Sequence, residues 1–171
     1  ALKYLFHWFA TIRRKNGQVR SIKLMVLDVS RAHFHPPAVR ELYIDLPDED
    51  YEEGMVGRLL RTLYGTRDAA HEWGNFCNDK VSDIGFEVGK SSPCLYYHRE
   101  EENVGWCHGD DLVFGGESGF LDHVYESLSA HMILKKRAVL GFESGDDKHI
   151  SILNRLVSIG ERGGKKYVSY E

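Results

Sequence analysis

The sequence predicts an α+β fold in which an antiparallel sheet has helices packed on one face. Short apolar segments with strand-like alternation are separated by turn residues. Amphipathic segments with helical spacing lie among them, and two of the strand segments are close enough along the chain to form a hairpin. No internal repeat or low-complexity segment interrupts this order, so residues 1–171 are expected to form a single domain or part of one.

Composition excludes several classes of protein. The chain has 22 Lys and Arg against 26 Asp and Glu, so its formal charge is −4, which argues against a protein that coats nucleic acid by bulk charge. Three cysteines without a CxxC pair exclude a disulfide framework and favour a reducing, intracellular location. No apolar run is long enough to span a bilayer, so no membrane partner is expected. The chain begins at Ala1 without a signal-peptide pattern, and we expect it to be part of a longer polypeptide.

The first half of the chain predicts one helix and one fully buried strand. Residues 2–10 carry apolar side chains at helical spacing, which indicates a packing helix. Residues 22–29 are apolar and β-branched, which predicts a buried strand that carries Asp28 near its end. A basic turn at 12–20, a half-buried strand at 41–47, an acidic solvated loop at 48–53 and a short strand at 55–60 complete this half.

The second half predicts two helices and an acidic hairpin. Asp68 is expected to cap a helix over 69–84, unless it has a role at a binding site, and Ser118 to cap a second helix. Strands are expected at 94–98, 103–107, 112–114, 150–159 and 165–169. The turn between the second and third of these carries Asp110 and Asp111.

Three carboxylates are the strongest candidates for chemistry. If the strand that ends at Asp28 lies beside the hairpin, Asp28, Asp110 and Asp111 come together, and like charges so close need cations. Carboxylate oxygens suit Mg²⁺, and two such ions support phosphoryl transfer. The plainer alternative is ordinary turn chemistry for the Asp-Asp pair.

Five sequence blocks carry a resemblance to a known family. In order along residues 22–159 they read IKLMVLDVSRAHF, ELYIDLP, RLLRTLYGTRDAAHEW, IGFEVGKSSPCLYYH and GWCHGDDLVFGG. The family pattern reads DVKxAFLxG, EVYMxQP, LYGLKQAPRxW, LGF…DPCLY and YVDDL. The chain thus resembles the reverse transcriptase of copia-type long-terminal-repeat retrotransposons, in the same block order and at similar spacing.

The resemblance implies a polymerase palm with part of the fingers, without the thumb and ribonuclease H domains. Asp28, Asp110 and Asp111 would hold two Mg²⁺ ions, with Mn²⁺ as a substitute, in an RNA-directed DNA polymerase. A primer 3′-hydroxyl would attack the α-phosphate of a deoxynucleoside triphosphate and release pyrophosphate. The implied partners are an RNA or DNA template with its primer, deoxynucleoside triphosphates, and the remaining polyprotein domains: fingers, thumb, ribonuclease H and integrase.

The resemblance also implies binding residues around the acids. His33 and Phe34 would lie under the sugar, Asp68 stands where the family has a Gln near the nucleotide, and either Lys136 or Lys148 would be the base near the triphosphate. The candidates for contact with nucleic-acid phosphates are Arg13, Arg14, Lys15 and Arg67.

Departures from the family pattern keep two alternatives open. His108-Gly109 replaces Tyr-Val before the paired acids, and His33 replaces an aromatic residue. One alternative is a degenerate, catalytically inactive retroelement fragment, and a minor one is a palm-type nucleotide cyclase. A zinc site at His33 and His35 lacks an obvious third soft ligand. Cys77, Cys94 and Cys107 are predicted to be small core residues.

Overall fold

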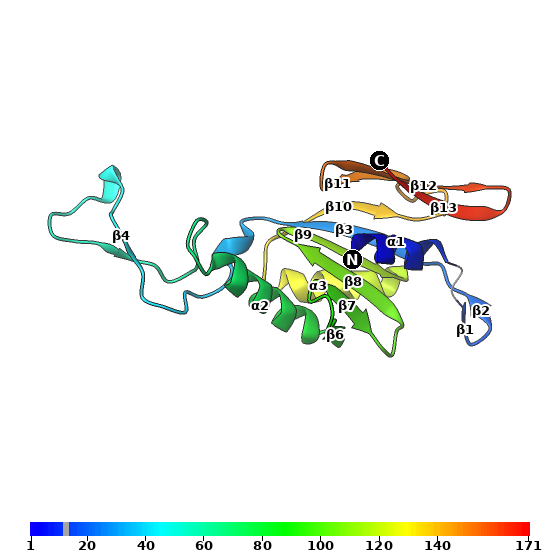
Figure 1. The fold of residues 1–171 in the computed structure, drawn as a ribbon, viewed down its shortest axis with the longest axis horizontal. Helices are drawn as coiled ribbons and strands as arrows, with labels where there is room; N and C mark the ends of the chain where they lie inside the picture. The colour runs from blue at the N-terminus through cyan, green and yellow to red at the C-terminus, as the bar shows by residue number, and fades with distance from the viewer. Residues whose placement is uncertain (12–13) are drawn as a thin grey trace.

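A six-stranded antiparallel sheet forms the body of the molecule, as the computed structural model in Figure 1 shows. The structure describes residues 1–11 and 14–171, without the side chain of Arg14. The strand order is β10-β3-β9-β8-β7-β6, so β3 and β9 are central. The strands are β3 (Lys23–Val29), β6 (Phe86–Val88), β7 (Leu95–His98), β8 (Asn103–His108), β9 (Asp111–Gly116) and β10 (Leu134–Leu140). The predicted α+β class with an antiparallel sheet is confirmed, whereas β6 and β10 were not predicted.

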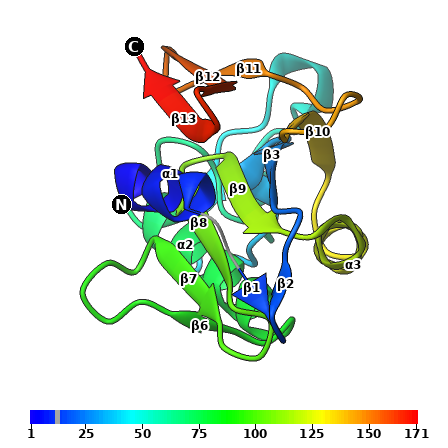
Figure 2. The same ribbon diagram turned by 90° about the vertical axis from the view of Figure 1, so that its right-hand side faces the viewer.

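Helices cover both faces of this sheet, so the prediction of helices on one face is wrong. Helices α2 (Ala69–Ser82) and α3 (Ser118–Ser129) pack on one face, and α1 (Leu2–Ala10) packs on the other (Figure 2). The alternation of β3 is the reason, because successive side chains of a strand point to opposite faces. Met25 and Leu27 join the core under α2 and α3, while Leu24 and Val26 join the core under α1.

A second sheet of three strands covers α1. It consists of β11 (His149–Ile152), β12 (Arg155–Arg162) and β13 (Lys165–Tyr170) in antiparallel order. The single strand predicted at 150–159 is wrong, because Leu153 and Asn154 have positive φ angles of 51° and 58° and form a hairpin turn between β11 and β12. The strand predicted at 165–169 is confirmed as β13.

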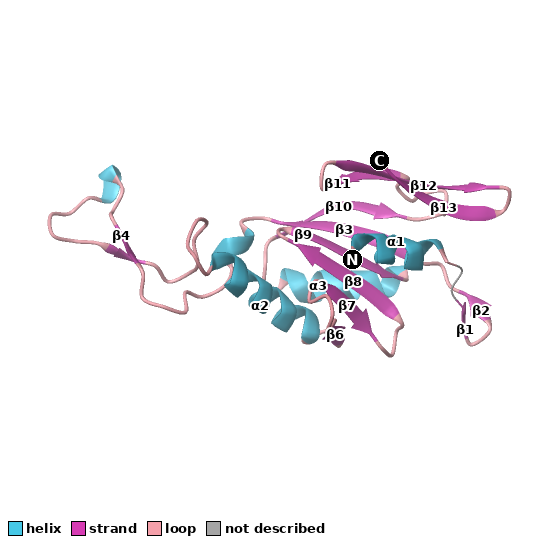
Figure 3. Ribbon diagram, viewed as in Figure 1, coloured by secondary structure: helices cyan, strands magenta, loops and turns pink. Residues whose placement is uncertain are grey.

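An arm extends from the body between β3 and α2 (Figures 1 and 3). It begins after η1 (Ala32–Phe34) and contains η2 (Asp48–Asp50) and a ribbon of β4 (Tyr43–Ile44) with β5 (Gly57–Arg58). The half-buried strand predicted at 41–47 is wrong, because only two residues pair and both are exposed. The arm projects away from the core, so its alternating apolar residues have no face to bury. The acidic segment 48–53 is exposed as predicted.

The predicted N-cap position of Asp68 is confirmed, whereas the predicted cap at Ser118 is wrong. Asp68 occupies the N-cap position of α2, but its side chain makes no capping hydrogen bond. Ser118 is the first residue of α3, and Glu117 holds the cap position. The basic turn is confirmed as a hairpin of β1 (Arg14–Lys15) and β2 (Gln18–Val19). Among the described residues, no helix is long and apolar enough to cross a membrane.

A substitution at Gly115 tests how closely α1 packs on the sheet. A Cβ at Gly115 would lie 2.5 Å from Trp8 Cζ3 and 3.2 Å from Leu24 Cδ2. We expect Gly115→Ala to lower the free energy of unfolding by about 1–3 kcal/mol, because a rigid ring and a central strand must move apart. Urea denaturation measures this change.

The matched control is Gly119→Ala in α3, where a Cβ meets nothing within 4 Å. This variant is expected to gain about 0.5–1 kcal/mol from helix propensity. Equal stability of Gly115→Ala and the unaltered chain would contradict the packing described here.

Candidate active site

Three strands bring the predicted acids to one end of the large sheet. Asp28 and Asp111 are register partners across β3 and β9, and His108 and Asp111 are partners across β8 and β9. The Val29 amide donates to the Asp110 carbonyl at 2.8 Å, which fixes the hairpin tip against the end of β3. The backbone therefore places these three residues at adjacent strand ends, while the predicted convergence of their carboxylates stays a prediction.

The hairpin tip is held from the side of α2. Gly109 and Asp110 form the two-residue loop between β8 and β9, and Gly109 has a φ of +59°, which favours glycine. Trp73 of α2 donates its indole N–H to the Gly109 carbonyl at 2.6 Å. Trp73 is buried, as predicted, and it thus couples the helix to the turn that carries Asp110.

The electrostatics of the site centre on Asp111. Burial raises the pKa of its carboxyl, the neighbouring charges of Asp110 and Asp28 raise it further, and the Arg137 guanidinium opposes them. Arg137 Nη1 lies 3.2 Å from Asp111 Oδ1, and Nη2 donates to the Ser151 carbonyl at 3.1 Å. The positive charge of the Arg137 guanidinium thus offsets part of the repulsion among the carboxylates of Asp28, Asp110 and Asp111.

Arg137 was missed in the sequence, and the two predicted lysines lie elsewhere. Lys136 contacts Asp122 at 3.6 Å and lies over the Tyr125 ring at 4.4 Å, on the side of α3. Lys148 donates to two backbone carbonyls, at 2.6 and 2.7 Å. The register of β10 shifts between Lys136 and Ala138, at Arg137. Such a bulge re-aims a side chain, and the basic triplet 135–137 was the only signal available.

The donor set has the chemistry for hard divalent cations. Carboxylate oxygens from three adjacent positions are the ligands that Mg²⁺ takes in proteins. Within the described part of the chain, however, no three His, Cys, Asp or Glu side chains are grouped closely enough to hold a metal ion. The residues suit the ion in type and in backbone placement, and Arg137 supplies the nearest positive charge to Asp111.

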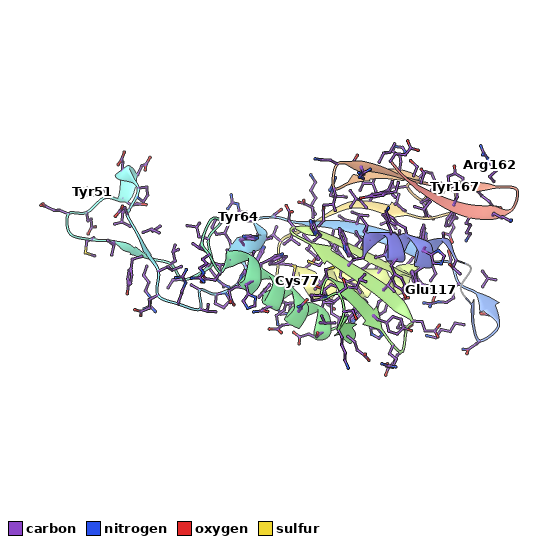
Figure 4. All side chains as sticks on the ribbon, viewed as in Figure 1. Tyr51, Tyr64, Cys77, Glu117, Arg162 and Tyr167 are labelled. Carbon is purple, nitrogen blue, oxygen red and sulfur yellow. The ribbon has the colours of Figure 1, made fainter. Side chains whose placement is uncertain are left out.

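The residues predicted under the nucleotide sugar follow directly after β3. His33 lies in η1 and stacks on Tyr64 with ring centroids 4.4 Å apart, and its buried Nδ1 has no hydrogen-bond partner. Phe34 is exposed and meets Tyr64 edge-on. Tyr64 lies where the arm joins the body (Figure 4). A cavity of about 490 Å³ opens beside the hairpin tip, and His33, Trp73 and Gly109 are among the residues that line it.

The remaining predicted binding residues are not brought to the acids. Asp68 accepts three hydrogen bonds from Arg40, at 2.6 to 3.0 Å, and this guanidinium lowers the pKa of the Asp68 carboxyl. Lys15 pairs with Glu101 at 3.0 Å, near the start rather than the end of β3. Arg67 is exposed beside Asp68. Arg13 and the side chain of Arg14 lie outside the described residues.

Comparison with known proteins shows similarity to a transposon polyprotein. The chain is 28% identical over 116 residues to the "Retrovirus-related Pol polyprotein from transposon TNT 1-94" of Nicotiana tabacum. The chain is similar to a transposon Pol polyprotein. The match covers 64% of this chain and 9% of the polyprotein, so the chain spans a small part of that relative. No protein-family model and no solved structure matches the chain.

The pH dependence of stability tests the crowding of charge at Asp111. We expect Asp111→Asn to raise the free energy of unfolding at pH 7 by up to about 1 kcal/mol, because it removes a charge that burial and two carboxylates disfavour. A carboxyl with a raised folded-state pKa lowers stability as pH rises above its ordinary value of 3.8. The gain should therefore disappear as pH falls below that value.

Urea denaturation at several pH values measures this effect. Asp79→Asn removes an exposed carboxylate of α2, and it is expected to change stability by less than about 0.5 kcal/mol. An Asp111→Asn variant that is less stable than the unaltered chain at pH 7 would show that the site does not crowd its charges.

Arg137 gives a second test of the same site. Arg137→Met is expected to raise the pKa of Asp111 further, because the guanidinium holds it down. Carboxyl NMR titration measures this pKa, and Lys136→Met, which removes a base directed at Asp122, is the control expected to leave it unchanged. A pKa that stays constant in Arg137→Met contradicts the ion pair.

Proposed function

We propose that this chain is the palm part, with some of the fingers, of an RNA-directed DNA polymerase of a copia-type retrotransposon polyprotein. The observation that carries the proposal is the register pairing of Asp28 with Asp111 beside the turn residue Asp110. Separate segments of the chain supply these acids to one sheet end, which ordinary turn chemistry does not require. The similarity to a transposon Pol polyprotein supports the same reading.

In this proposal the three carboxylates hold two Mg²⁺ ions. The bound ions would supply a lowered pKa for the primer 3′-hydroxyl and charge stabilisation for the α-phosphate and the leaving pyrophosphate. The chain's own part is to position the ligands: the β3–β9 pairing sets Asp28 against Asp111, and Trp73 holds the turn of Asp110. Arg137 would give up its contact with Asp111 when a cation takes that oxygen.

The proposed partners are a template with its primer, deoxynucleoside triphosphates and the other domains of the polyprotein. The nucleotide would lie over His33 and Phe34, beside the cavity at the hairpin tip. Tight binding of nucleic acid requires many phosphate contacts from Lys and Arg side chains. This chain has fewer Lys and Arg than Asp and Glu, with a net charge of −4. We therefore assign most of the phosphate contacts with the template–primer duplex to polyprotein domains beyond this chain.

An inactive retroelement fragment is the second candidate, and specific observations favour it. Asp111 is paired with Arg137, and the described residues contain no group of three potential metal ligands. Asp68, at the position of the family's Gln, is held by Arg40. In this candidate the fold persists while the acids no longer assemble around metal ions. No observation favours the nucleotide cyclase.

Primer extension separates the two candidates. The polyprotein that contains this segment is expected to extend a DNA primer on an RNA template with Mg²⁺ or Mn²⁺. Asp110→Asn should reduce synthesis by at least about a hundredfold, because it removes one electrostatic partner of the transition state. Asp79→Asn is the control and should retain activity.

Absence of metal-dependent synthesis by the unaltered polyprotein would reject the active polymerase. Titration of this chain with Mn²⁺ then tests the inactive fragment. Saturable binding that Asp110→Asn abolishes would show that the metal site survives without turnover, and binding that Asp110→Asn leaves unchanged would show that the acids hold no ion.

A further inference from the structure

Two of the three cysteines, Cys77 and Cys107, meet between α2 and the large sheet. Cys77 lies on α2, between that helix and the sheet (Figure 4), and Cys107 lies on β8. Their sulfur atoms are 3.6 Å apart, and the two side chains are buried, with 0% and 9% of each residue exposed. Cys94, just before β7, accepts the backbone N–H of Cys107 at 2.9 Å. The sequence predicted only three small core residues here.

We propose that Cys77 and Cys107 are a modification site, a dithiol that hydrogen peroxide oxidises to a disulfide between α2 and β8. This proposal does not depend on the polymerase function. A disulfide has an S–S distance of about 2.05 Å, so the two sulfurs must approach by about 1.5 Å in total from their present 3.6 Å. Small rotations of two side chains supply that movement without a change of fold.

The cavity beside the hairpin gives the oxidant access. Cys107 and Cys94 line this cavity of about 490 Å³, together with His108 and Gly109, whereas Cys77 is not one of its lining residues. Peroxide is small enough to enter, and it meets Cys107 before Cys77. Access therefore assigns the first step to Cys107, although the hydrogen bond with Cys77 and burial raise the pKa of the Cys107 thiol and make this the slow step.

The chemistry balances in two steps. Cys107 Sγ attacks one oxygen of hydrogen peroxide, the O–O bond breaks, and the products are a Cys107 sulfenic acid and one water. Cys77 Sγ then attacks the sulfenic sulfur, an S–S bond forms, the S–O bond breaks, and the hydroxyl leaves with the thiol proton as a second water. The two sulfurs lose two electrons, which the peroxide gains.

The environment of Cys77 favours the second step. The hydrogen bond with Cys107 lowers the pKa of the Cys77 thiol, against the effect of burial. A thiol of lower pKa supplies more thiolate, which is the attacking species. The Tyr96 hydroxyl, which donates to Asn78 Oδ1 at 2.8 Å, also lies 3.7 Å from Cys77 Sγ, and this contact lowers the pKa of the Cys77 thiol as well.

The disulfide would tie the acidic hairpin to α2. Cys107 Sγ lies 3.8 Å from the carbonyl of Gly109, which already accepts the Trp73 indole N–H. A covalent link beside this hydrogen bond closes the chain segment between Cys77 and Cys107 in the unfolded state. The oxidised chain should therefore melt about 5–10 °C higher than the reduced chain.

Mass spectrometry of the full 171-residue chain tests the proposal. The chain is treated with excess hydrogen peroxide, free thiols are alkylated, and the intact mass and the disulfide-linked peptides are determined. The expected product has lost two hydrogens, links Cys77 to Cys107 and leaves Cys94 alkylated. Cys94→Ser should form the same product, whereas Cys77→Ser should not form it.

Two outcomes overturn the proposal. One is a chain that keeps three alkylated cysteines after treatment, and the other is a peptide that links Cys94 to Cys107 or Cys77. Because the unaltered chain alone gives these readouts, a variant that fails to fold does not weaken the test. A melting temperature that does not rise in the linked chain would contradict the predicted stabilisation by the Cys77–Cys107 disulfide.

Discussion

The antiparallel pairing of β3 with β9 is the constraint on which the rest of the structure depends. Its register sets Leu24 and Val26 against α1 and Met25 and Leu27 against α2 and α3. Because side chains alternate along a strand, a slip by one residue would exchange the two cores. The same register places Asp28 opposite Asp111. Packing on both faces therefore fixes the acidic end of the sheet.

That acidic end opposes the stability of the fold that carries it. Asp111 is half-buried and lies within reach of two other carboxylate charges, and one guanidinium only partly compensates them. The ion pair with Arg137 links β9 to β10, but an amide in place of Asp111 would avoid the repulsion among the carboxylates. Crowded charge of this kind is a feature of many functional sites, and structural ion-pair networks produce it as well.

The local sequence pattern was sufficient to predict strands whose apolar residues are buried by their immediate neighbours in the sheet. Residues 22–29 form a run of apolar residues, and the segment 103–114 has two such runs on either side of a polar turn. The strands predicted in both segments are confirmed. Pattern failed at 41–47, where alternation exists but the arm has no core to face. It also failed at 150–159, where Leu153 and Asn154 adopt positive φ angles that residues other than glycine seldom adopt.

The backbone placement of the three acids was predictable from the sequence, and the counter-charge of Asp111 was not. Asp28 lies near the end of β3, Asp110 lies in the β8–β9 turn and Asp111 begins β9, and these ends meet in a sheet whose pairing can be inferred. Arg137 reaches Asp111 because β10 shifts register there, and a bulge depends on pairing across the sheet rather than on local sequence. Asp68 could serve as a helix cap or at a binding site, and Arg40, 28 residues earlier in the chain, instead engages it. Long-range partners of this kind leave no mark in a local pattern.

The most direct test of the account is anomalous diffraction from crystals of this chain soaked in Mn²⁺. Anomalous density is expected between the carboxylates of Asp28, Asp110 and Asp111, with the Arg137 side chain displaced from Asp111 Oδ1. Density elsewhere, or an intact ion pair between Arg137 and Asp111 at saturating Mn²⁺, would contradict it.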